Sequence, residues 1–137
     1  MVVLAGCICI DSQGRVLLIH RNTSTRIQWE TPGGKVNQGE TPAKAAMREA
    51  LEELGAKAII IKFIGARSFE EDGKKMVYHW FQARLEGEAR IVEKEKFDEL
   101  RYFTWEELGE MREGLSANAG NLVEAYFAGE IGLEKQE

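Results

Sequence analysis

The segment from Thr41 to Gly55, TPAKAAMREALEELG, has the most strongly constrained local structure in this chain. Thr41 is a residue type that caps helix N-termini, Pro42 suits the first helical position, and Gly55 suits the end of a helix. Apolar residues spaced by three and four positions form one face of a helix. The sequence therefore predicts a helix that packs on a sheet through a stripe formed by Ala43, Met47, Ala50, Leu51 and Leu54.

Strand and turn signals occupy most of the remaining chain. Runs of apolar and β-branched residues bounded by turn residues predict strands at residues 2–10, 15–21, 56–69, 74–86 and 99–105. Short turns after the first and third of these strands predict two hairpins. Residues 22–30 read as a polar loop and residues 31–35 as a tight turn that contains adjacent glycines.

Further helices are expected after the last strand, at residues 105–113 and 117–128, and the charged tail 133–137 is expected to be frayed. Long hairpins with interposed helices are typical of an α+β fold, in which helices cover the faces of a mixed β-sheet. The length of 137 residues suits a single domain, residues 1–137, with its own hydrophobic core.

Charge and hydropathy exclude several classes of partner. No apolar run is long enough to cross a bilayer, and no secretory signal opens the chain. The net charge of −5 is opposite to that expected for a protein that binds a nucleic-acid polymer. A small phosphorylated substrate stays compatible with this charge, because a bound cation can reverse the local sign of the potential.

Cys7 and Cys9 lie two positions apart in the first predicted strand, so their side chains point to the same face. This arrangement disfavours a disulfide between them, and two ligands alone rarely make a zinc site. We therefore expect buried, reduced thiols, which favour a cytoplasmic location.

Glu49, Glu52 and Glu53 form a cluster of carboxylates on the predicted helix, almost opposite its apolar stripe. Arg48 lies at the border and can pair with Glu52, four positions later. Such a cluster is either an ordinary solvated face or a set of ligands for a cation that offsets the repulsion between the carboxylates. Glutamate oxygens are hard ligands that suit Mg²⁺ or Mn²⁺.

The loop before the helix favours the second interpretation. Gly33 and Gly34 allow the backbone to approach another group closely, and a glycine carbonyl can add an uncrowded oxygen ligand. Glu40 precedes the helix cap. It either braces this loop by accepting backbone N–H groups or compensates the positive end of the helix dipole.

The run from Gly34 to Ala56 resembles the Nudix box, G-x5-E-x7-R-E-U-x-E-E-x-G-U, in which U is a bulky aliphatic residue. The two aliphatic positions hold Ala50 and Ala56, which are smaller than the pattern prefers. All the fixed positions match at the required spacing, and they are Gly34, Glu40, Arg48, Glu49, Glu52, Glu53 and Gly55.

The resemblance implies an α/β/α sandwich that binds divalent metal and hydrolyses a nucleoside diphosphate linked to a further group X. It implies that Glu49 and Glu53 are the main metal ligands, one of them also being the general base. Arg48 would orient a glutamate. The full set of implied catalytic and metal-binding residues in this region is Gly33, Gly34, Glu40, Arg48, Glu49, Glu52 and Glu53.

The family resemblance also leads us to expect an acidic ligand from outside the box. The candidates are Glu93, Glu95 and Glu99, in the polar stretch before the fifth predicted strand. A charged stretch of this kind is usually a solvated loop. Among the three, we choose Glu95.

Weaker similarity to MutT-like nucleoside triphosphate pyrophosphohydrolases extends over almost the whole chain. It places Asn118 in contact with the base, although this residue also suits the cap of the last helix. Thr31 departs from the apolar residue often found before PGG in these proteins. Further candidate substrate contacts, each with a purely structural alternative, are Arg21 and Arg26 for phosphate, Trp29 and Tyr78 for base stacking, and His79 for the pocket wall.

Three functions fit these features. The first is a MutT-like (d)NTP pyrophosphohydrolase that uses Mg²⁺ and releases a nucleoside monophosphate and pyrophosphate. The second is an ADP-ribose or nucleotide-sugar pyrophosphatase of the same superfamily. The third is a non-catalytic nucleotide-sensing module, which the intact glutamates disfavour. The resemblance also allows a homodimer, although no segment identifies an interface.

Overall fold

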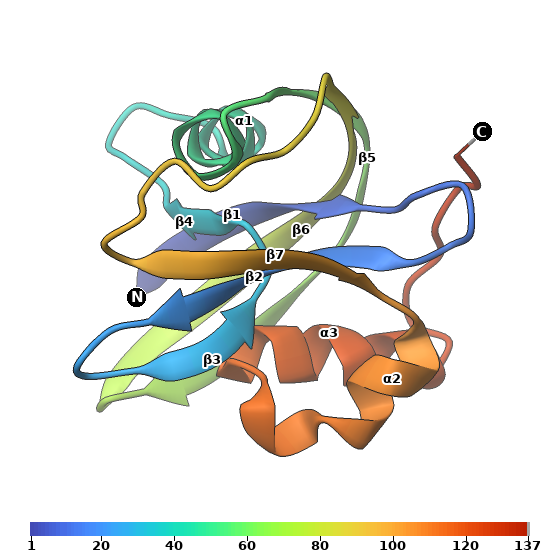
Figure 1. Ribbon diagram of the computed structural model, residues 1–137. Coiled ribbons are helices and arrows are strands. Elements are labelled where there is room, and N and C mark those ends of the chain that lie inside the picture. Colours follow the sequence, from blue (N-terminus) through green and yellow to red (C-terminus); the bar gives the residue numbers. More distant parts are fainter. Residues whose placement is uncertain (137) are drawn as a thin grey trace.

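Two β-sheets form the middle of the molecule, with helices on either side of them (Figure 1). The computed structural model describes residues 1–136. The strands are β1 (Val2–Cys9), β2 (Val16–Asn22), β3 (Ile27–Glu30), β4 (Gly33–Lys35), β5 (Lys57–Glu71), β6 (Lys74–Glu86) and β7 (Phe97–Phe103). The helices are α1 (Pro42–Leu54), α2 (Trp105–Glu110), a 3₁₀ helix (Arg112–Gly114) and α3 (Ala117–Phe127).

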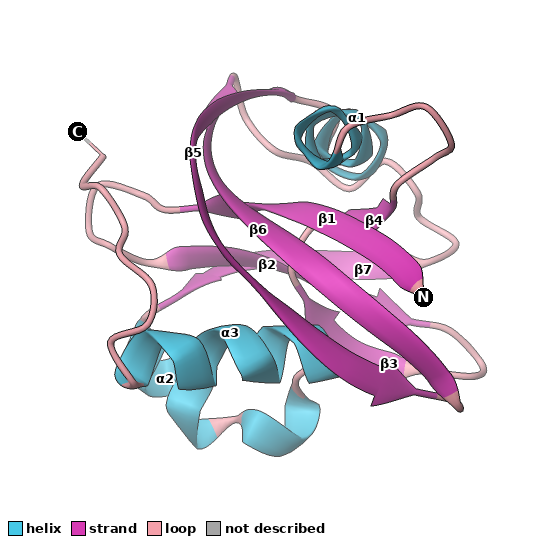
Figure 2. Cartoon of the chain, turned by 180° about the vertical axis from the view of Figure 1, so that it is seen from behind, coloured by secondary structure: helices cyan, strands magenta, loops and turns pink. Residues whose placement is uncertain are grey.

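The layers confirm the predicted α+β sandwich. The mixed sheet has the strand order β4-β1-β6-β5, and the antiparallel sheet has the order β3-β2-β7. Helix α1 lies on one side of the sheets, and α2 and α3 lie on the other (Figures 1 and 2). Within the described residues, no helix is long and apolar enough to cross a membrane.

Both faces of the central strands are buried, because successive side chains of a strand point to opposite sides. In β1, Ala5, Cys7 and Cys9 pack in the core beneath α1, whereas Ile8 packs in the core beside α2 and α3. Both cysteines are buried free thiols, as expected. Burial, with a smaller contribution from the nearby Glu53 carboxylate, raises the pKa of Cys7 to about 12.

The first predicted hairpin is wrong. β1 and β2 follow each other through a turn, but they belong to different sheets and share only an isolated bridge between Ile10 and Val16. Instead, β1 pairs in parallel with β6, along its whole length from Val2 to Cys9. The turn signal was correct, but a distant strand determines how β1 pairs. The second predicted hairpin, formed by β5 and β6, is confirmed.

The polar loop and the glycine turn contain two short strands that were not predicted. β3 pairs with β2, and β4 pairs antiparallel with β1, where Gly33 lies opposite Gly6. A Cβ atom on Gly33 would lie 1.9 Å from the Tyr78 hydroxyl oxygen and 2.6 Å from the Ala5 carbonyl oxygen. The glycine is therefore required for close contact between strands.

Helix α1 has the predicted ends. The Thr41 hydroxyl accepts the Lys44 N–H, Pro42 opens the helix, and Gly55 ends it with a φ of 65°. The predicted packing face is wrong at Leu51, which is 57% exposed. The helix is rotated relative to the prediction, so that alanines approach the sheet closely and one glutamate joins the buried side. Its buried residues are Ala45, Ala46, Ala50, Glu53 and Leu54.

The tail that was expected to be frayed is docked at Glu134, and residue 137 lies outside the described residues. Gln82 of β6 is fully buried, and its side-chain amide forms a pair of hydrogen bonds with the Glu134 backbone. The Gln82 Nε2 group donates to the Glu134 carbonyl at 2.6 Å, and the Glu134 N–H donates to Gln82 Oε1 at 2.8 Å. Ile131 and Leu133 pack on the core beside α3.

Replacing Gln82 with leucine should release this segment, because leucine has similar size but can neither donate nor accept a hydrogen bond. We expect a loss of about 1–3 kcal/mol in the free energy of unfolding in urea, typical of breaking buried hydrogen bonds. Amide hydrogen exchange at Glu134 should also become faster. The control is Lys62→Gln, which removes only a 3.9 Å surface ion pair to Glu134 and should change stability little. Unchanged exchange at Glu134 would contradict the docking.

Candidate active site

The centre of the site is the contact between α1 and β4. Glu53 is only 5% exposed, and its Oε1 atom accepts the Gly33 N–H at 2.8 Å. Burial, and secondly the negative charge of Glu49, raise the pKa of Glu53 well above its ordinary value. A buried carboxylate with a single hydrogen-bond donor is costly unless a cation neutralises it. This arrangement favours a cation site over a solvated face.

Glu49 lies directly against the glycine backbone. A Cβ atom on Gly34 would be 2.6 Å from the Glu49 carboxyl carbon, so glycine is needed for this close approach. Burial raises the pKa of Glu49, an effect that the hydrogen bond from Arg48 partly opposes. Glu52, by contrast, has a half-exposed side chain at the rim.

Arg48 connects the parts of this region. Its Nε donates to Glu40 at 2.8 Å, and its two terminal nitrogens reach Glu49, Glu52 and the Lys35 carbonyl. Glu40 also accepts the Asn37 N–H at 3.0 Å, so it braces the loop between β4 and α1. The hydrogen bond from Arg48, and secondly that from Asn37, lower the pKa of Glu40 to about 2. Arg48 and Glu40 thus position the glutamates and the glycine loop together.

Replacing Arg48 with lysine should test this positioning role, because lysine keeps the charge but not the planar fork of donors. We expect turnover to fall about 10- to 100-fold, as is typical for residues that orient metal ligands. The measurement is kcat at saturating Mg²⁺. The control is Lys44→Gln on an exposed part of the same helix, which should leave kcat unchanged. Equal activity of the Arg48→Lys variant and the wild-type protein would contradict the role.

The donor set fits a hard divalent cation. The carboxylates of Glu49 and Glu53, with Glu52 at the rim and the backbone oxygens of Gly33 and Gly34, supply only oxygen atoms, as Mg²⁺ and Mn²⁺ prefer. Among residues 1–136, no three acidic, histidine or cysteine side chains already converge on one point. Arg48 and the Gly33 N–H hold the carboxylates instead.

Glu30 and Glu93, both outside α1, lie close enough for their negative charges to contribute to the raised pKa of Glu53, whereas the ligand role of Glu95 stays a prediction. The negative charge of Glu93 contributes to the raised pKa values of Glu49 and Glu53. Glu95 is exposed in the turn that leads into β7, and Glu99 pairs with Arg101 on the surface. Residues two apart in a turn do not share a direction as they would in a strand, so the sequence could not choose between them.

A cavity of about 560 Å³ adjoins the glutamates, and Gly33 and Gly34 line it. It includes several of the predicted substrate contacts. The polar side chains that line it are Arg21, Thr23, Thr25, Arg26, Gln28, Glu30, Thr31, Lys35, Glu71, Asp72, Tyr78, Ser116 and Asn118. Its size is typical of a site for a small ligand.

The two predicted phosphate-binding arginines are held in different ways. Arg21 donates to both carboxylate oxygens of Glu30, at 2.6 and 3.2 Å, and stacks over the Phe97 ring. Glu30, which adjoins the predicted glycine turn, was not identified from the sequence. Arg26 pairs with Glu71 and Asp72, at the tip of the β5–β6 hairpin beside the β2–β3 turn (Figures 1 and 2). Of these two arginines, Arg21 is therefore the one on which the charge of Glu53 acts.

Tyr78 and Asn118 both form a hydrogen bond with Thr31 in a buried part of the cavity. Tyr78 is not placed for stacking, since its hydroxyl bonds to Thr31 and packs against the glycines of β1 and β4. Burial raises the pKa of Tyr78 well above its ordinary value. Asn118 does not cap α3, because Ser116 is the N-cap and accepts the Ala119 N–H. It lines the cavity instead, as the base-contact alternative requires.

Trp29 and His79 do not line this cavity. Trp29 contacts His20 and Phe103, on the side of β3 opposite Gln28 and Glu30. His79 neighbours Phe63, because it points to the face of β6 opposite Tyr78. Strand alternation explains both corrections.

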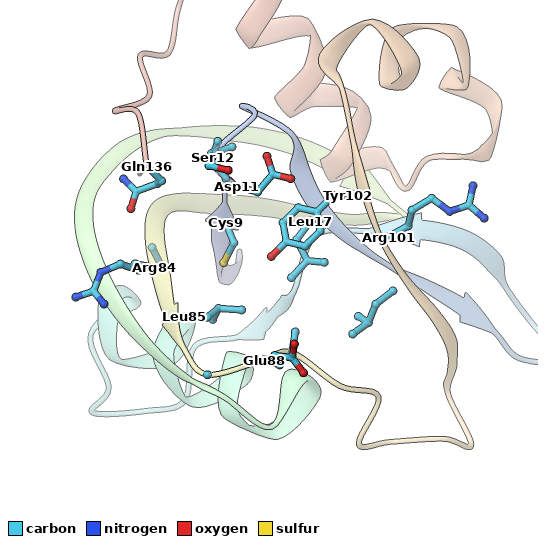
Figure 3. Close-up of a pocket in the computed structure, with 15 residues that line it drawn as sticks. Cys9, Asp11, Ser12, Leu17, Arg84, Leu85, Glu88, Arg101, Tyr102 and Gln136 are labelled. Atoms are coloured by element: carbon cyan, nitrogen blue, oxygen red, sulfur yellow. The ribbon is translucent and has the colours of Figure 1, made fainter.

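A second cavity of about 560 Å³ has a different lining (Figure 3). It lies near Cys9 at the end of β1, with Leu17, Leu85 and Tyr102 around it. The side chains of Arg84 and Arg101 extend away from it. It contains none of the predicted catalytic, metal-binding or substrate-binding residues.

Residues 2–126 match the family model described as the NUDIX domain. The chain belongs to the Nudix family. It is therefore a hydrolase of phosphoric anhydride bonds, in a family that acts on small nucleotide substrates and generally uses divalent metal ions. Between α1 and β4, the structure brings together several fixed residues of the Nudix box, Gly34, Arg48, Glu49 and Glu53, with Gly33 directly before the box.

Relatives of known name agree with this assignment. An RNA pyrophosphohydrolase from Sphingopyxis alaskensis is 32% identical over 124 residues, which cover 78% of each chain. An 8-oxo-dGTP diphosphatase from Proteus vulgaris is 40% identical over 55 residues, 39% of this chain and 48% of the relative.

Solved structures share the fold over most of this chain. A MutT Nudix hydrolase from Burkholderia pseudomallei superposes with a TM-score of 0.77 at 28% identity, covering 89% of this chain and 95% of that one. A MutT protein from Methanosarcina mazei superposes with a TM-score of 0.81 at 23% identity, covering 93% and 94%. The second likeness concerns the fold alone.

Proposed function

We propose that this Nudix hydrolase is a Mg²⁺-dependent, MutT-like pyrophosphohydrolase that converts a nucleoside triphosphate to a nucleoside monophosphate and pyrophosphate. The observation that carries the proposal is the cavity of about 560 Å³ that shares Gly33 and Gly34 with the glutamate cluster. It has a cationic arginine near the glutamates and a buried asparagine further away. This arrangement suits a phosphate chain that leads from a base to the metal-binding helix.

The protein residues would divide the reaction among themselves. Glu49 and Glu53, with Glu52 and a glycine carbonyl, would hold Mg²⁺ (Mn²⁺ being an alternative). When bound, Mg²⁺ neutralises phosphate charge and acidifies water. Either Glu49 or Glu53 would accept the proton of the attacking water, since both carboxylates lie against the glycine loop that lines the cavity. The water attacks phosphorus, and the P–O bond to the leaving phosphate breaks.

Arg21 is the residue that we assign to the phosphate chain. Glu30 engages its Nε and one terminal nitrogen, which leaves donors on the other side of the guanidinium group. The charge of Glu53 also contributes to the raised pKa of Arg21. Arg26 supplies a further positive charge at the cavity wall, while it remains paired with Glu71 and Asp72.

A hydrolysis screen with Mg²⁺ and product identification tests this function. The substrates are dNTPs, NTPs, ADP-ribose, nucleotide sugars and dinucleoside polyphosphates. A 5′-triphosphorylated oligoribonucleotide is added because one relative is named RNA pyrophosphohydrolase. Pyrophosphate and a nucleoside monophosphate from a triphosphate are the expected products. AMP and ribose phosphate from ADP-ribose as the preferred reaction would replace the proposal with the nucleotide-sugar alternative.

A further inference from the structure

The second cavity, near Cys9, has an apolar interior to which both sheets contribute. Cys9 on β1 and Ala83 on β6 belong to the mixed sheet, whereas Leu17 on β2 belongs to the antiparallel sheet. All three line the cavity and are buried in the core beneath α1. Leu85 and Leu100 add further apolar surface from β6 and β7. The volume of about 560 Å³ is typical of a site for a small molecule.

The charged residues that line this cavity balance one another. Two are acidic and two are basic, namely Asp11, Glu88, Arg84 and Arg101. The two arginine side chains extend away from the cavity (Figure 3). Asp11 is paired with Arg15 at 2.8 Å, and Glu88 is exposed. A charged ligand would lose its hydration in the apolar interior without facing a net opposite charge, so the lining favours a neutral ligand.

Tyr102 gives the cavity one polar group. Figure 3 shows its hydroxyl group directed toward the interior, on the side of Cys9 and Leu85. This hydroxyl group forms no hydrogen bond within residues 1–136. Burial, and secondly the nearby Cys9 thiol, raise the pKa of Tyr102, so the group stays protonated and can both donate and accept. The tyrosine ring and the cysteine sulfur also make favourable contacts with an aromatic ring.

The segment between β6 and β7 connects this cavity with the catalytic glutamates. Its first residues, 87–89, line the cavity. The next residue, Arg90, donates its backbone N–H at 2.9 Å to the carbonyl of Leu54, which directly follows Glu53 in α1. Three residues later, Glu93 lies close enough for its charge to act on Glu49 and Glu53. One short segment therefore contacts both places.

We propose that the second cavity is a regulatory site for a small neutral molecule with an aromatic ring and a hydroxyl group, whose binding strengthens cation binding by the catalytic glutamates. A ligand that packs against residues 87–89 restrains the segment, which keeps the negative charge of Glu93 beside Glu49 and Glu53. An added negative charge there favours a bound cation. The inference uses the cation site of the proposed function, but it does not depend on which nucleotide is hydrolysed.

The first test measures binding of 4-fluorophenol to the substrate-free protein by ¹⁹F NMR. We expect saturable binding with a dissociation constant of about 1 mM or lower, as is reasonable for a ligand of this size. The anion 4-fluorobenzoate should bind at least about tenfold more weakly. Leu85→Trp, which fills the cavity, should abolish binding.

Tyr102→Phe tests the hydroxyl group and keeps the test decisive if Leu85→Trp does not fold. This variant should bind 4-fluorophenol about fivefold more weakly than wild type does, because one hydrogen bond is lost. Its affinity for fluorobenzene, which has no hydroxyl group, should equal that of wild type. No saturable binding of 4-fluorophenol to wild type, or equal affinity of wild type and both variants for it, would overturn the inference.

The second test measures the affinity for Mg²⁺ by isothermal titration calorimetry, with and without saturating 4-fluorophenol. We expect about a fivefold gain in Mg²⁺ affinity, and saturating Mg²⁺ should raise the affinity for 4-fluorophenol by the same factor, since coupling between two sites is reciprocal. Glu93→Gln should bind 4-fluorophenol normally but lose the coupling. Equal Mg²⁺ affinity of wild type with and without 4-fluorophenol would overturn the regulatory role and leave the proposed function standing. Failure of the wild-type protein to bind Mg²⁺ would overturn both.

Discussion

Replacing Glu53 with glutamine should lower kcat for Mg²⁺-dependent hydrolysis by about 10³-fold or more while the protein stays folded. The amide keeps an oxygen that can accept the Gly33 N–H, so the contact between α1 and β4 can persist. It removes the negative charge that would bind the cation. A loss of several kcal/mol of transition-state stabilisation corresponds to this factor in rate.

The stability of the Glu53→Gln variant distinguishes a chemical role of Glu53 from a structural one. Glu53 is buried and has a raised pKa, so its neutral replacement should leave the urea unfolding midpoint unchanged or raise it. Glu106→Gln, in the first turn of α2, is the matched control, because Glu106 is exposed and lies outside the cavity. Its activity should equal that of wild type. Near-wild-type activity of Glu53→Gln at every Mg²⁺ concentration would show that the metal-site assignment is wrong.

Local signals in the sequence were sufficient to predict helix α1 and to single out its cluster of glutamates. The cap residues Thr41 and Gly55 act within a few positions, so they could be recognised without the fold. The rotation of the helix could not be recognised in this way. Leu51 and Glu53 exchange their expected environments because Gly33, twenty positions before Glu53, draws that carboxylate inward. A long-range hydrogen bond overrides the apolar stripe.

The same distinction explains the errors in the sheets. The turn after β1 was correctly located, but its strand pairs with β6, whose residues lie more than seventy positions away. Such a partner cannot be deduced from the pattern of one strand. In the substrate cavity, strand alternation separates Tyr78 from His79 and Glu30 from Trp29. The face of each strand that points to the cavity had to be known before the residue lining the cavity could be distinguished from its neighbour in the sequence.

Replacing Gly33 with alanine should lower the free energy of unfolding by about 3 kcal/mol or more, or prevent folding. The added Cβ atom would lie 1.9 Å from the Tyr78 hydroxyl oxygen, 2.6 Å from the Ala5 carbonyl oxygen and 2.8 Å from the Gly6 Cα atom. Two of these atoms are backbone, so no side-chain rotation can relieve the overlap, and β4 must move away from β1. Overpacking of a well-packed core costs this much only when the backbone is involved.

The matched control is Gly120→Ala in α3, where an added Cβ atom has no neighbour within 4 Å. That change should increase stability by about 0.5–1 kcal/mol, because alanine favours a helix more than glycine does. Urea unfolding followed by circular dichroism measures both variants. Wild-type stability of Gly33→Ala would mean that β4 is not held against β1 as described. The hydrogen bond from the Gly33 N–H to Glu53 needs β4 in this position. Without the pairing of β4 with β1, Gly33 and Glu53 would therefore not form one site.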